Sequence, residues 1–458
     1  MSIPSVLVMR RGRPMAAMSW ILCLLTLPVL GMLLWWVLGR RHLERKRRRK
    51  RQTHATICQS IEELRHNLEA SRASRANSIF PLAHVPAAMA DSVFEPTGGN
   101  DVTVLDSKEA FDKMAEDIRG ARHHVHAMFY IWKADETGRQ FRDLLAEKAR
   151  EGVQVRVLCD AVGSPAMRGP FARPLRQAGA SVVRFMPPRL LSRSPRLNFR
   201  NHRKILVVDG EVGVISGFNI GDEYRKRWRD VGLRIAGPAV DQLQEIFADD
   251  WYYATDENLA DPAYFCHWKT DLGPRKGADC AAVASGPDSE FMPIHDAMFV
   301  AINRTKRRLY VTTPYFIPSR PIVAALRAAT YRGVDVRLML PALSDMRLVR
   351  WAARSYYEEL LAVGVRIFEY QPSMLHAKVM VFDDDLAVLG SANLDSRSFR
   401  LNFEASCFVH SEQIASDLIE RFETNLKDCA EVLPAEFERR PWAEKLLDGT
   451  ANLLSPLL

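Results

Sequence analysis

The chain has 458 residues, enough for two or three average domains or for one large duplicated domain. Apolar residues make up 47% and charged residues 26%, as in a globular protein with a sizeable core. The net charge of +8 does not indicate a nucleic-acid partner, because residues 1–51 alone carry +11 and leave −3 on the remainder. Seven cysteines without a C-x-x-C pair argue against a disulfide framework and a zinc site, and favour reduced thiols in the cytoplasm.

The first predicted element is an uncharged apolar run at residues 16–38. From it we expect an N-terminal tail at 1–17 and one transmembrane helix at 18–38, with a tolerable kink at Pro28. A signal peptide is the rival interpretation, but the run is too long for one and a dense basic cluster follows it. Nine basic residues after the run against three before it predict that the rest of the chain lies in the cytoplasm.

A basic juxtamembrane segment and linker is expected at residues 39–100. From about residue 101, amphipathic helical stretches alternate with short apolar strands. We predict helices at 108–119 and 141–151, and strands at 124–131, 153–159 and 205–208. This alternation predicts an α/β fold whose sheets are covered by helices.

The second half of the chain repeats the order of the first. The strand pattern that begins at Gly152 returns at Gly333, and the region of Tyr130 returns at Tyr315, with offsets of 181 and 185 residues. Such similarity indicates two copies of one unit, which commonly share a site at a pseudo-twofold interface. We therefore expect repeat 1 at 101–270, repeat 2 at 271–440 and an apolar tail at 441–458. The tail either rests on a membrane or lies against the domain.

Both copies carry the same polar residues at the same spacing. Counted from a histidine, lysine follows at +2, aspartate at +7, asparagine at +17 and an acid at +28. The first set is His202, Lys204, Asp209, Ser216, Gly217, Asn219 and Asp230. The second set is His376, Lys378, Asp383, Gly390, Ser391, Asn393 and Glu404. A lone H-x-K is meaningless, but agreement at five positions in two copies indicates a functional site.

These residue types suit chemistry on a phosphodiester. A neutral imidazole is both a nucleophile and a proton shuttle, which makes His202 and His376 candidate catalytic residues. Lys204 and Lys378 supply positive charge to an anionic oxygen, and the asparagine and small-residue turn of each copy add phosphate-binding donors. We expect no cofactor and no metal. Metal ligation by the two histidines is the alternative, weakened by the adjacent lysines, which would repel a cation.

The conserved spacing also includes two kinds of acid. Asp230 and Glu404 are expected to accept a hydrogen bond from imidazole Nδ1–H and so orient each ring. The alternative is a plain surface or helix-cap carboxylate. Asp209 and Asp383 complete the catalytic motifs, but their odd offset of +7 points their side chains away from the histidines, which favours a salt bridge or a turn.

Two H-x-K-x4-D motifs, each followed by a small-residue turn and an asparagine, are similar to the signature of the phospholipase D superfamily. Further stretches resemble bacterial cardiolipin synthases, among them Phe129-Tyr-Ile131, Trp228-Arg-Asp230 and the closing Ser455-Pro-Leu-Leu458. The resemblance extends from about residue 100 to the C-terminus. This sequence departs from the family pattern in two places. The usual Gly-Gly or Gly-Ser turn reads Ser216-Gly217 in the first copy, and one N-terminal membrane helix is expected where the family often has two.

The resemblance implies transfer of a phosphatidyl group between two phosphatidylglycerol molecules, giving cardiolipin and glycerol through a phosphatidyl-histidine. It implies His202 as nucleophile, His376 as acid and base, membrane phospholipids as partners and a location in the bacterial inner membrane. The one apolar run predicts a single pass. A phospholipase D-type hydrolase, or a transferase with another donor or acceptor, is the main alternative. A nuclease conflicts with the acidic body, and a non-catalytic scaffold predicts decay of one His–Lys pair. The basic, apolar segment at 187–203 is expected to guide anionic headgroups, or else to be a solvated loop.

Overall fold

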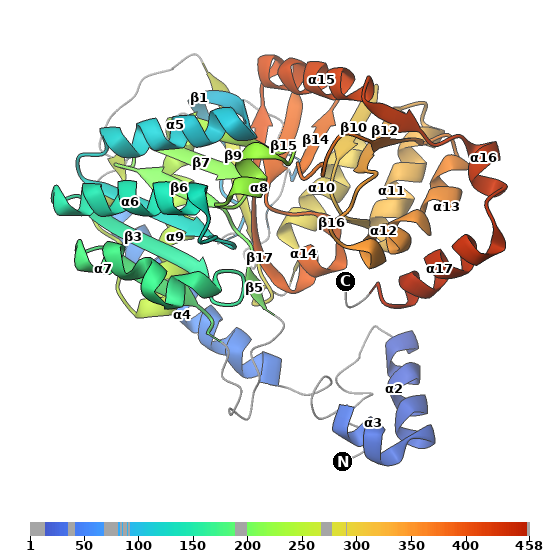
Figure 1. Cartoon of the computed structure of the whole chain (residues 1–458), viewed down its shortest axis with the longest axis horizontal. Helices are drawn as coiled ribbons and strands as arrows, with labels where there is room; N and C mark the ends of the chain where they lie inside the picture. Colours follow the sequence, from blue (N-terminus) through green and yellow to red (C-terminus); the bar gives the residue numbers. More distant parts are fainter. Residues whose placement is uncertain are drawn as a thin grey trace. The chain divides into compact units, whose positions relative to one another are not determined.

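The structure is a computed structural model that describes residues 14–34, 42–67, 81–82, 85, 89, 92–187, 199–266, 277–289 and 291–455. The chain divides into two compact units, Met1–Gln52 and Thr53–Leu458. The second unit contains both repeats, which Figure 1 shows in cyan to green and in yellow to red.

In the first unit the apolar run forms two short helices where one continuous helix was expected. Helix α2 (Pro14–Thr26) ends before Leu27, and α3 (Pro28–Leu34) begins at Pro28. The proline ring has no N–H with which to continue the hydrogen bonds of α2. Residues 35–38 of the expected span lie outside the described residues. No helix in the described part of the chain is both long and apolar enough to cross a membrane.

The expected linker contains a long helix, α4 (His42–Asn67), whose sequence runs from the first unit into the second. In the second unit, its Ile57 and Ile61 are buried in the hydrophobic core. Part of the segment expected at 39–100 is therefore an element of the core.

The first repeat alternates strands and helices as predicted. Its strands are β1 (Thr97–Asp106), β2 (His124–Phe129), β3 (Gln154–Asp160), β4 (Ser181–Phe185), β5 (Arg200–Asn201), β6 (Ile205–Val208), β7 (Val212–Ser216) and β8 (Val231–Ala236). Its helices are α5 (Ser107–Gly120), α6 (Glu136–Arg150), α7 (Arg173–Gln177), α8 (Asp222–Lys226) and α9 (Ala239–Thr255). All five elements predicted in this repeat are present; the strand at 205–208 has the predicted bounds and the other four differ at their ends.

The second repeat follows the same order. Its strands are β9 (Ala278–Ser285), β10 (Arg308–Thr312), β11 (Phe316–Ile317), β12 (Asp335–Pro341), β13 (Arg366–Tyr370), β14 (Val379–Phe382), β15 (Leu386–Gly390), β16 (Leu394–Asp395), β17 (Asn402–His410) and β18 (Cys429–Glu431). Its helices are α10 (Pro293–Arg304), α11 (Arg320–Tyr331), α12 (Arg347–Arg354), α13 (Tyr357–Leu361), α14 (Ser396–Arg400), α15 (Glu412–Leu426), α16 (Pro434–Glu438) and α17 (Trp442–Leu453).

One large sheet runs through both repeats. Its strand order is β18-β13-β12-β10-β14-β15-β17-β9-β1-β8-β7-β6-β2-β3-β4, and β5 pairs with β17 beside this path. Outward from the antiparallel β1–β9 pair, strands β8, β7, β6, β2, β3 and β4 match β17, β15, β14, β10, β12 and β13. This symmetric order is that of two copies related by a pseudo-twofold axis, so the predicted duplication is present.

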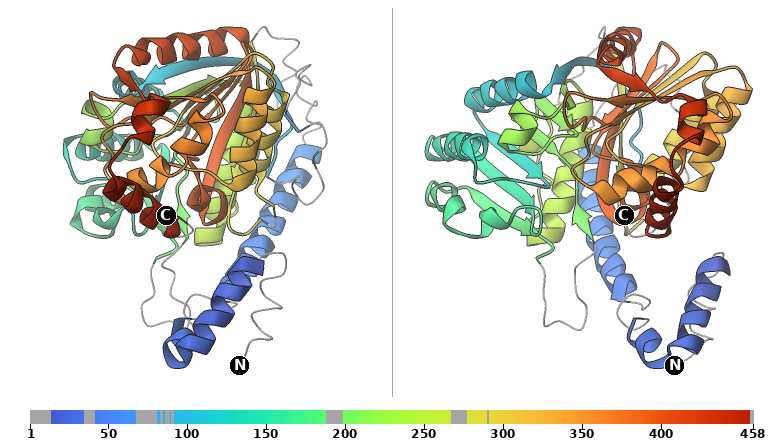
Figure 2. Two further views of the ribbon diagram at one scale, coloured as in Figure 1. Left: turned by 90° about the vertical axis from the view of Figure 1, so that its right-hand side faces the viewer. Right: turned by 45° about the vertical axis from the view of Figure 1, so that its right-hand side comes forward.

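Both faces of the sheet are covered, which explains the continuous apolar strands. In β6, Ile205 and Val207 belong to a central core, whereas Leu206 and Val208 belong to the outer core of repeat 1. The central core includes α9, α15 and strands of both repeats. The remaining large helices of each repeat cover the outer faces (Figure 2). A core shared between the repeats fixes the strand ends that face each other at their junction.

Candidate active site

Each motif histidine is held by the acid of the other repeat. His202 Nδ1 lies 3.0 Å from Glu404 Oε2, and His376 Nδ1 lies 2.6 Å from Asp230 Oδ2. Both carboxylates are fully buried. The structure therefore brings the expected orienting acids to the histidines, but with the partners exchanged between copies. Equal spacing of +28 in both copies could not reveal this exchange.

The backbone around the histidines accounts for the exchange. The His202 N–H donates to the carbonyl of Phe403 at 2.9 Å, and the His376 N–H donates to the carbonyl of Arg229 at 2.7 Å. Phe403 and Arg229 are the residues that precede the two acids. Each histidine segment thus lies beside the chain that leads to the acid of the other repeat, and the two motifs form one site.

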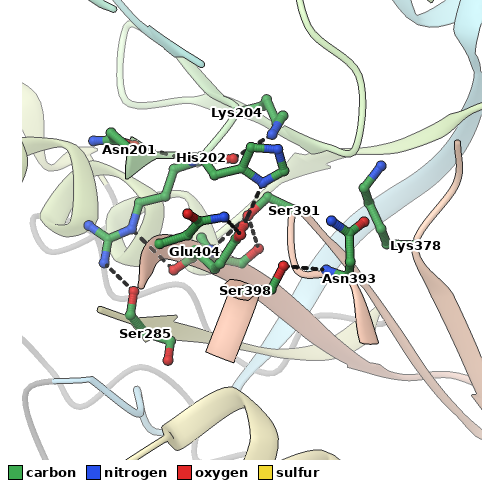
Figure 3. A network of polar contacts seen from close by, with 12 residues as sticks. Asn201, His202, Lys204, Ser285, Lys378, Ser391, Asn393, Ser398 and Glu404 are labelled. Atoms are coloured by element: carbon green, nitrogen blue, oxygen red, sulfur yellow. Dashed lines mark hydrogen bonds and ion pairs between the residues drawn. The ribbon is translucent and has the colours of Figure 1, made fainter. Parts of the chain in front are cut away.

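Both motif lysines are buried at this site. Lys204 Nζ donates to the carbonyl of His202 at 2.5 Å, and Lys378 Nζ donates to the carbonyl of His376. Lys378 Nζ also lies 3.2 Å from His376 Nε2. Figure 3 shows Lys204 and Lys378 in the same close view as His202. Two lysine ammonium groups at one site, when charged, suit an anionic ligand.

Burial controls the charge of both histidines. It lowers the pKa of His202 to about 4, and Lys204 adds to this effect against the opposing charge of Glu404. Burial likewise lowers the pKa of His376 well below its ordinary value, with Lys378 adding to the effect. Both rings are therefore neutral near pH 7. Charged Glu404 can only accept a proton, so Nδ1 of His202 carries one and Nε2 keeps its lone pair.

Burial also lowers the pKa of Lys378 to about 8, against the opposing charge of Asp230. For Lys204, burial lowers the pKa well below its ordinary value, and Lys378 adds to the shift. The positive charge of Lys378 thus disfavours a second positive charge on Lys204. A phosphate between the two lysines would favour their charged forms, so this arrangement suits a negative ligand.

The two acids differ in their surroundings. Burial raises the pKa of Asp230 to about 7. Burial pushes the pKa of Glu404 upward too, but His202, Lys204 and the Ser391 hydroxyl outweigh it, and its pKa lies below the usual value. Ser391 Oγ donates to Glu404 Oε2 at 2.5 Å. Near pH 7 the Glu404 carboxyl is therefore ionised, whereas the Asp230 carboxyl is protonated in part of the molecules.

The small-residue turns support the acids at least as much as the ligand. Gly217 occupies the position equivalent to Ser391, and a Cβ there would lie 2.5 Å from Asp230 Oδ1 and 3.1 Å from the Lys378 side chain. Gly390 is likewise pressed against β17. Ser216 Oγ donates to the carbonyl of Phe218 at 3.3 Å. The turns of both copies thus permit the close approach of strand, acid and lysine.

The asparagines stay with the site, and the motif aspartates do not. Asn219 Oδ1 accepts from the N–H of Ile131 at 2.9 Å, and the Asn219 side chain also hydrogen-bonds the Tyr224 hydroxyl. Asn393 is buried in the second copy, near Ser398 in Figure 3. Asp209 and Asp383 lie at the far ends of β6 and β14. Their carboxylates accept from runs of backbone N–H groups, and both residues have left-handed φ angles of 55° and 52°. Their contacts are those of turn residues.

Aromatic residues that the motif does not contain surround the histidines. The ring of Tyr130 lies 5.0 Å from that of His202, and the ring of Tyr315 lies 6.4 Å from that of His376. Trp228 lies 5.1 Å from His376 as well. The motif search missed these residues, although Tyr130 and Tyr315 occupy equivalent positions at the offset of 185. That repetition was the available signal.

The chain was expected to guide headgroups with the segment at 187–203. Residues 188–198 lie outside the described residues, but Arg203 is described and is only 4% exposed. It faces the protein interior, so it does not belong to a headgroup-guiding surface. Within the described residues, no group of three or more His, Cys, Asp or Glu side chains is placed to hold a metal ion.

The chain is similar to one protein family over most of its length. A family model described as "Cardiolipin synthase, PLD-like domain" matches residues 114–251 and 298–426. Cardiolipin synthase of Geobacillus thermodenitrificans is 36% identical over 100% of this chain and 91% of its own. The major cardiolipin synthase of Bacillus subtilis is 37% identical over 99% of this chain and 96% of its own.

A solved structure shares the fold. The crystal structure of phosphatidylserine synthase from Haemophilus influenzae has a TM-score of 0.61 and 17% identity, covering 79% of this chain and 97% of that one. At this identity the likeness concerns the fold alone. The family match covers both repeats, and the sequence relatives cover nearly the whole chain. The chain therefore belongs to the cardiolipin synthase family of proteins with phospholipase D-like domains.

Proposed function

We propose that the chain is a cardiolipin synthase that transfers a phosphatidyl group from one phosphatidylglycerol to the hydroxyl of another, giving cardiolipin and glycerol. The observation that carries the proposal is the crossed pair of histidines and acids, flanked by two buried lysines. A phosphodiester needs a nucleophile, a proton donor and charge stabilisation, and these residues supply all three.

In the first step, His202 Nε2 attacks phosphorus and the bond from phosphorus to the glycerol oxygen breaks. The neutral ring of His202 and the ionised Glu404 favour this role, because the carboxylate stabilises the positive charge that develops on the ring. His376 delivers a proton to the departing glycerol oxygen. The raised pKa of Asp230, about 7, favours His376 as donor, because its pair holds a proton near neutral pH.

In the second step, a hydroxyl of the second phosphatidylglycerol attacks the phosphatidyl-histidine. His376 takes the hydroxyl proton, a new phosphorus–oxygen bond forms and the bond to His202 Nε2 breaks. Lys204, Lys378 and the two asparagines stabilise the charge on the non-bridging oxygens throughout. Every proton taken up in one step is released in the other, so the cycle restores the enzyme.

We further propose that the N-terminal apolar run anchors the protein in the bacterial inner membrane, as a single pass with the catalytic unit in the cytoplasm. The uncharged run and the nine basic residues after it support this topology. A lipid substrate also requires access to a bilayer. Two reporters fused after residue 458 test the topology. A reporter that fluoresces only in the cytoplasm should give signal, and signal from a reporter active only outside the cytoplasm would contradict the proposal.

The test of function is a product assay with the full chain in mixed micelles containing radiolabelled phosphatidylglycerol and EDTA. Labelled cardiolipin and released glycerol are expected, and both should disappear in the His202→Ala and His376→Ala variants. Phosphatidic acid as the sole product would mean that water is the acceptor, and the synthase assignment would give way to a hydrolase. Cardiolipin formed only after addition of phosphatidylethanolamine would change the donor.

A further inference from the structure

The residue between His202 and Lys204 in the first motif is a buried arginine with three partners. Arg203 Nε donates to the Glu404 carbonyl at 3.1 Å, and Nη2 donates to the Ser285 carbonyl at 3.3 Å. Nη1 donates to the Asp250 carboxylate at 2.7 Å. The guanidinium thus joins α9 of repeat 1 to two strands of repeat 2.

The two carbonyls belong to one rung of the sheet. Glu404 and Ser285 are directly opposed in the β17–β9 register. A planar guanidinium can hold both carbonyls and a carboxylate at once, because its donors point in fixed directions. Arg203 therefore fixes the backbone of the very residue whose carboxylate contacts His202.

Asp250 holds the other flank of His202 as well. Its Oδ2 accepts from Asn201 Nδ2 at 2.8 Å, and Asn201 Oδ1 accepts from the Arg203 N–H at 3.1 Å. The residues on both sides of His202 are thus fastened to one buried carboxylate. The second motif has no such arrangement, because Ala377 stands where Arg203 does in the first.

We propose that Arg203, held by Asp250, is a positioning residue for the first half of the reaction. It sets the place of Glu404 relative to His202 and thereby the direction of the Nε2 lone pair. This inference rests on the proposed function for the role of His202 as nucleophile. The second histidine, which exchanges protons in both steps, tolerates a less rigid support, and its motif carries only alanine.

A purely structural ion pair is the competing explanation, and the variant Arg203→Lys distinguishes the two explanations. Arg203→Lys keeps a positive charge opposite Asp250 but cannot hold both carbonyls, because an ammonium is a compact point charge. The matched control is Arg234→Lys, since Arg234 forms a two-point pair with Asp117 at 2.8 and 2.9 Å between β8 and α5. A double variant, Arg203→Met with Asp250→Asn, removes both charges together and avoids a lone buried charge.

The experiment mixes the full chain rapidly with micellar labelled phosphatidylglycerol and follows the first turnover of glycerol release. A misplacement of about 1 Å costs on the order of 100-fold in rate. We expect that loss in Arg203→Lys and in the folded double variant, with KM little changed and with Arg234→Lys near wild type. Melting temperatures of Arg203→Lys and Arg234→Lys should fall comparably. Release within about twofold of wild type in the folded double variant would overturn the proposal.

A second readout does not depend on the substrate. In histidine-labelled protein, the His202 Nδ1–H resonance, assigned by its loss in His202→Gln, reports its bond to Glu404. It should shift or broaden in Arg203→Lys and stay in place in Arg234→Lys. An unchanged resonance would contradict the positioning role. Failure of wild type to release glycerol would instead refute the proposed function and leave this readout to decide on Arg203.

Discussion

At the scale of single residues, the two halves of the site differ at the equivalent positions Ser391 and Gly217. Ser391 donates to Glu404, whereas Gly217 offers no hydroxyl to Asp230. Ser391→Ala should therefore raise the pKa of Glu404 and weaken its support of His202. A hydrogen bond to a charged group contributes about 1.5–3 kcal/mol, so we expect first-turnover glycerol release to slow about tenfold or more. Ser319→Ala, which removes a helix-capping hydroxyl from α11, is the control. Equal rates of glycerol release in Ser391→Ala and Ser319→Ala would contradict a role of the Ser391 hydroxyl in supporting Glu404.

We expect Lys378 and Asp230 to contribute to the alkaline limit of activity. The pKa of Lys378 is about 8 and that of Asp230 about 7, both shifted chiefly by burial. Lys378 is charged below its pKa and loses that charge as the pH rises through it, while Asp230 loses its proton one unit earlier. Plotted against pH, the logarithm of kcat should thus fall with a slope of −1 above about pH 7 and of −2 above about pH 8. Lys378→Arg stays charged and should keep only the one-proton slope. A two-proton slope in this variant, measured by cardiolipin formation, would exclude Lys378 as the second group.

At the scale of elements, strand β2 makes the fold sensitive to acid. His124 and His126 are fully buried in it, and burial lowers the pKa of His124 to about 3. The unfolded chain binds this proton near the ordinary value of 6.5, so stability should fall as the pH drops from there toward 3. His124→Phe should flatten that fall by about 1.4 kcal/mol per pH unit. Urea unfolding at several pH values measures it, and parallel curves for both proteins would contradict it.

Local pattern predicted the elements but not their pairing. The run at 205–208 coincides with β6, because an apolar stretch covered on both faces is readable from composition. The predicted strand at 124–131 ends at Phe129 instead, and Tyr130 turns toward His202. Arg203 seemed part of a basic loop, yet it pairs with Asp250, 47 residues away, in a helix of the same repeat. Such partners are fixed by tertiary packing, which periodicity does not contain.

At the scale of the whole molecule, the duplication explains why the sequence revealed the site's members and hid their connections. Equivalent strands lie at equivalent places on either side of the β1–β9 pair, and each histidine contacts the acid of the other copy. Identical spacings in both copies fit paired acids within a copy as well as between copies. The structure shows that the acids pair between copies, through the register of β5 on β17 and the bridge between Arg229 and Leu375.

The C-terminal helix α17 exposes large apolar side chains and buries an acidic one. Glu444 and the buried Asp448 of α17 lie 3.0 and 3.7 Å from Arg354, while Trp442 and Leu453 are 74% and 80% exposed. The tail therefore lies against the domain and also presents an apolar face. Exposed apolar residues on an amphipathic helix suit the surface of a bilayer, where a phospholipid substrate resides.

We therefore expect the double variant Trp442→Ser, Leu453→Ser to act poorly on phosphatidylglycerol in vesicles and normally on a dispersed short-chain analogue. Full burial of such a side chain is worth about 1.5–3 kcal/mol, so the vesicle rate should fall at least about tenfold. Lys445→Ser, an exposed change on the same helix, is the control for helix disturbance. A parallel loss with both substrates would assign α17 a role in the fold, and retention of both rates would show that this face does not contact lipid.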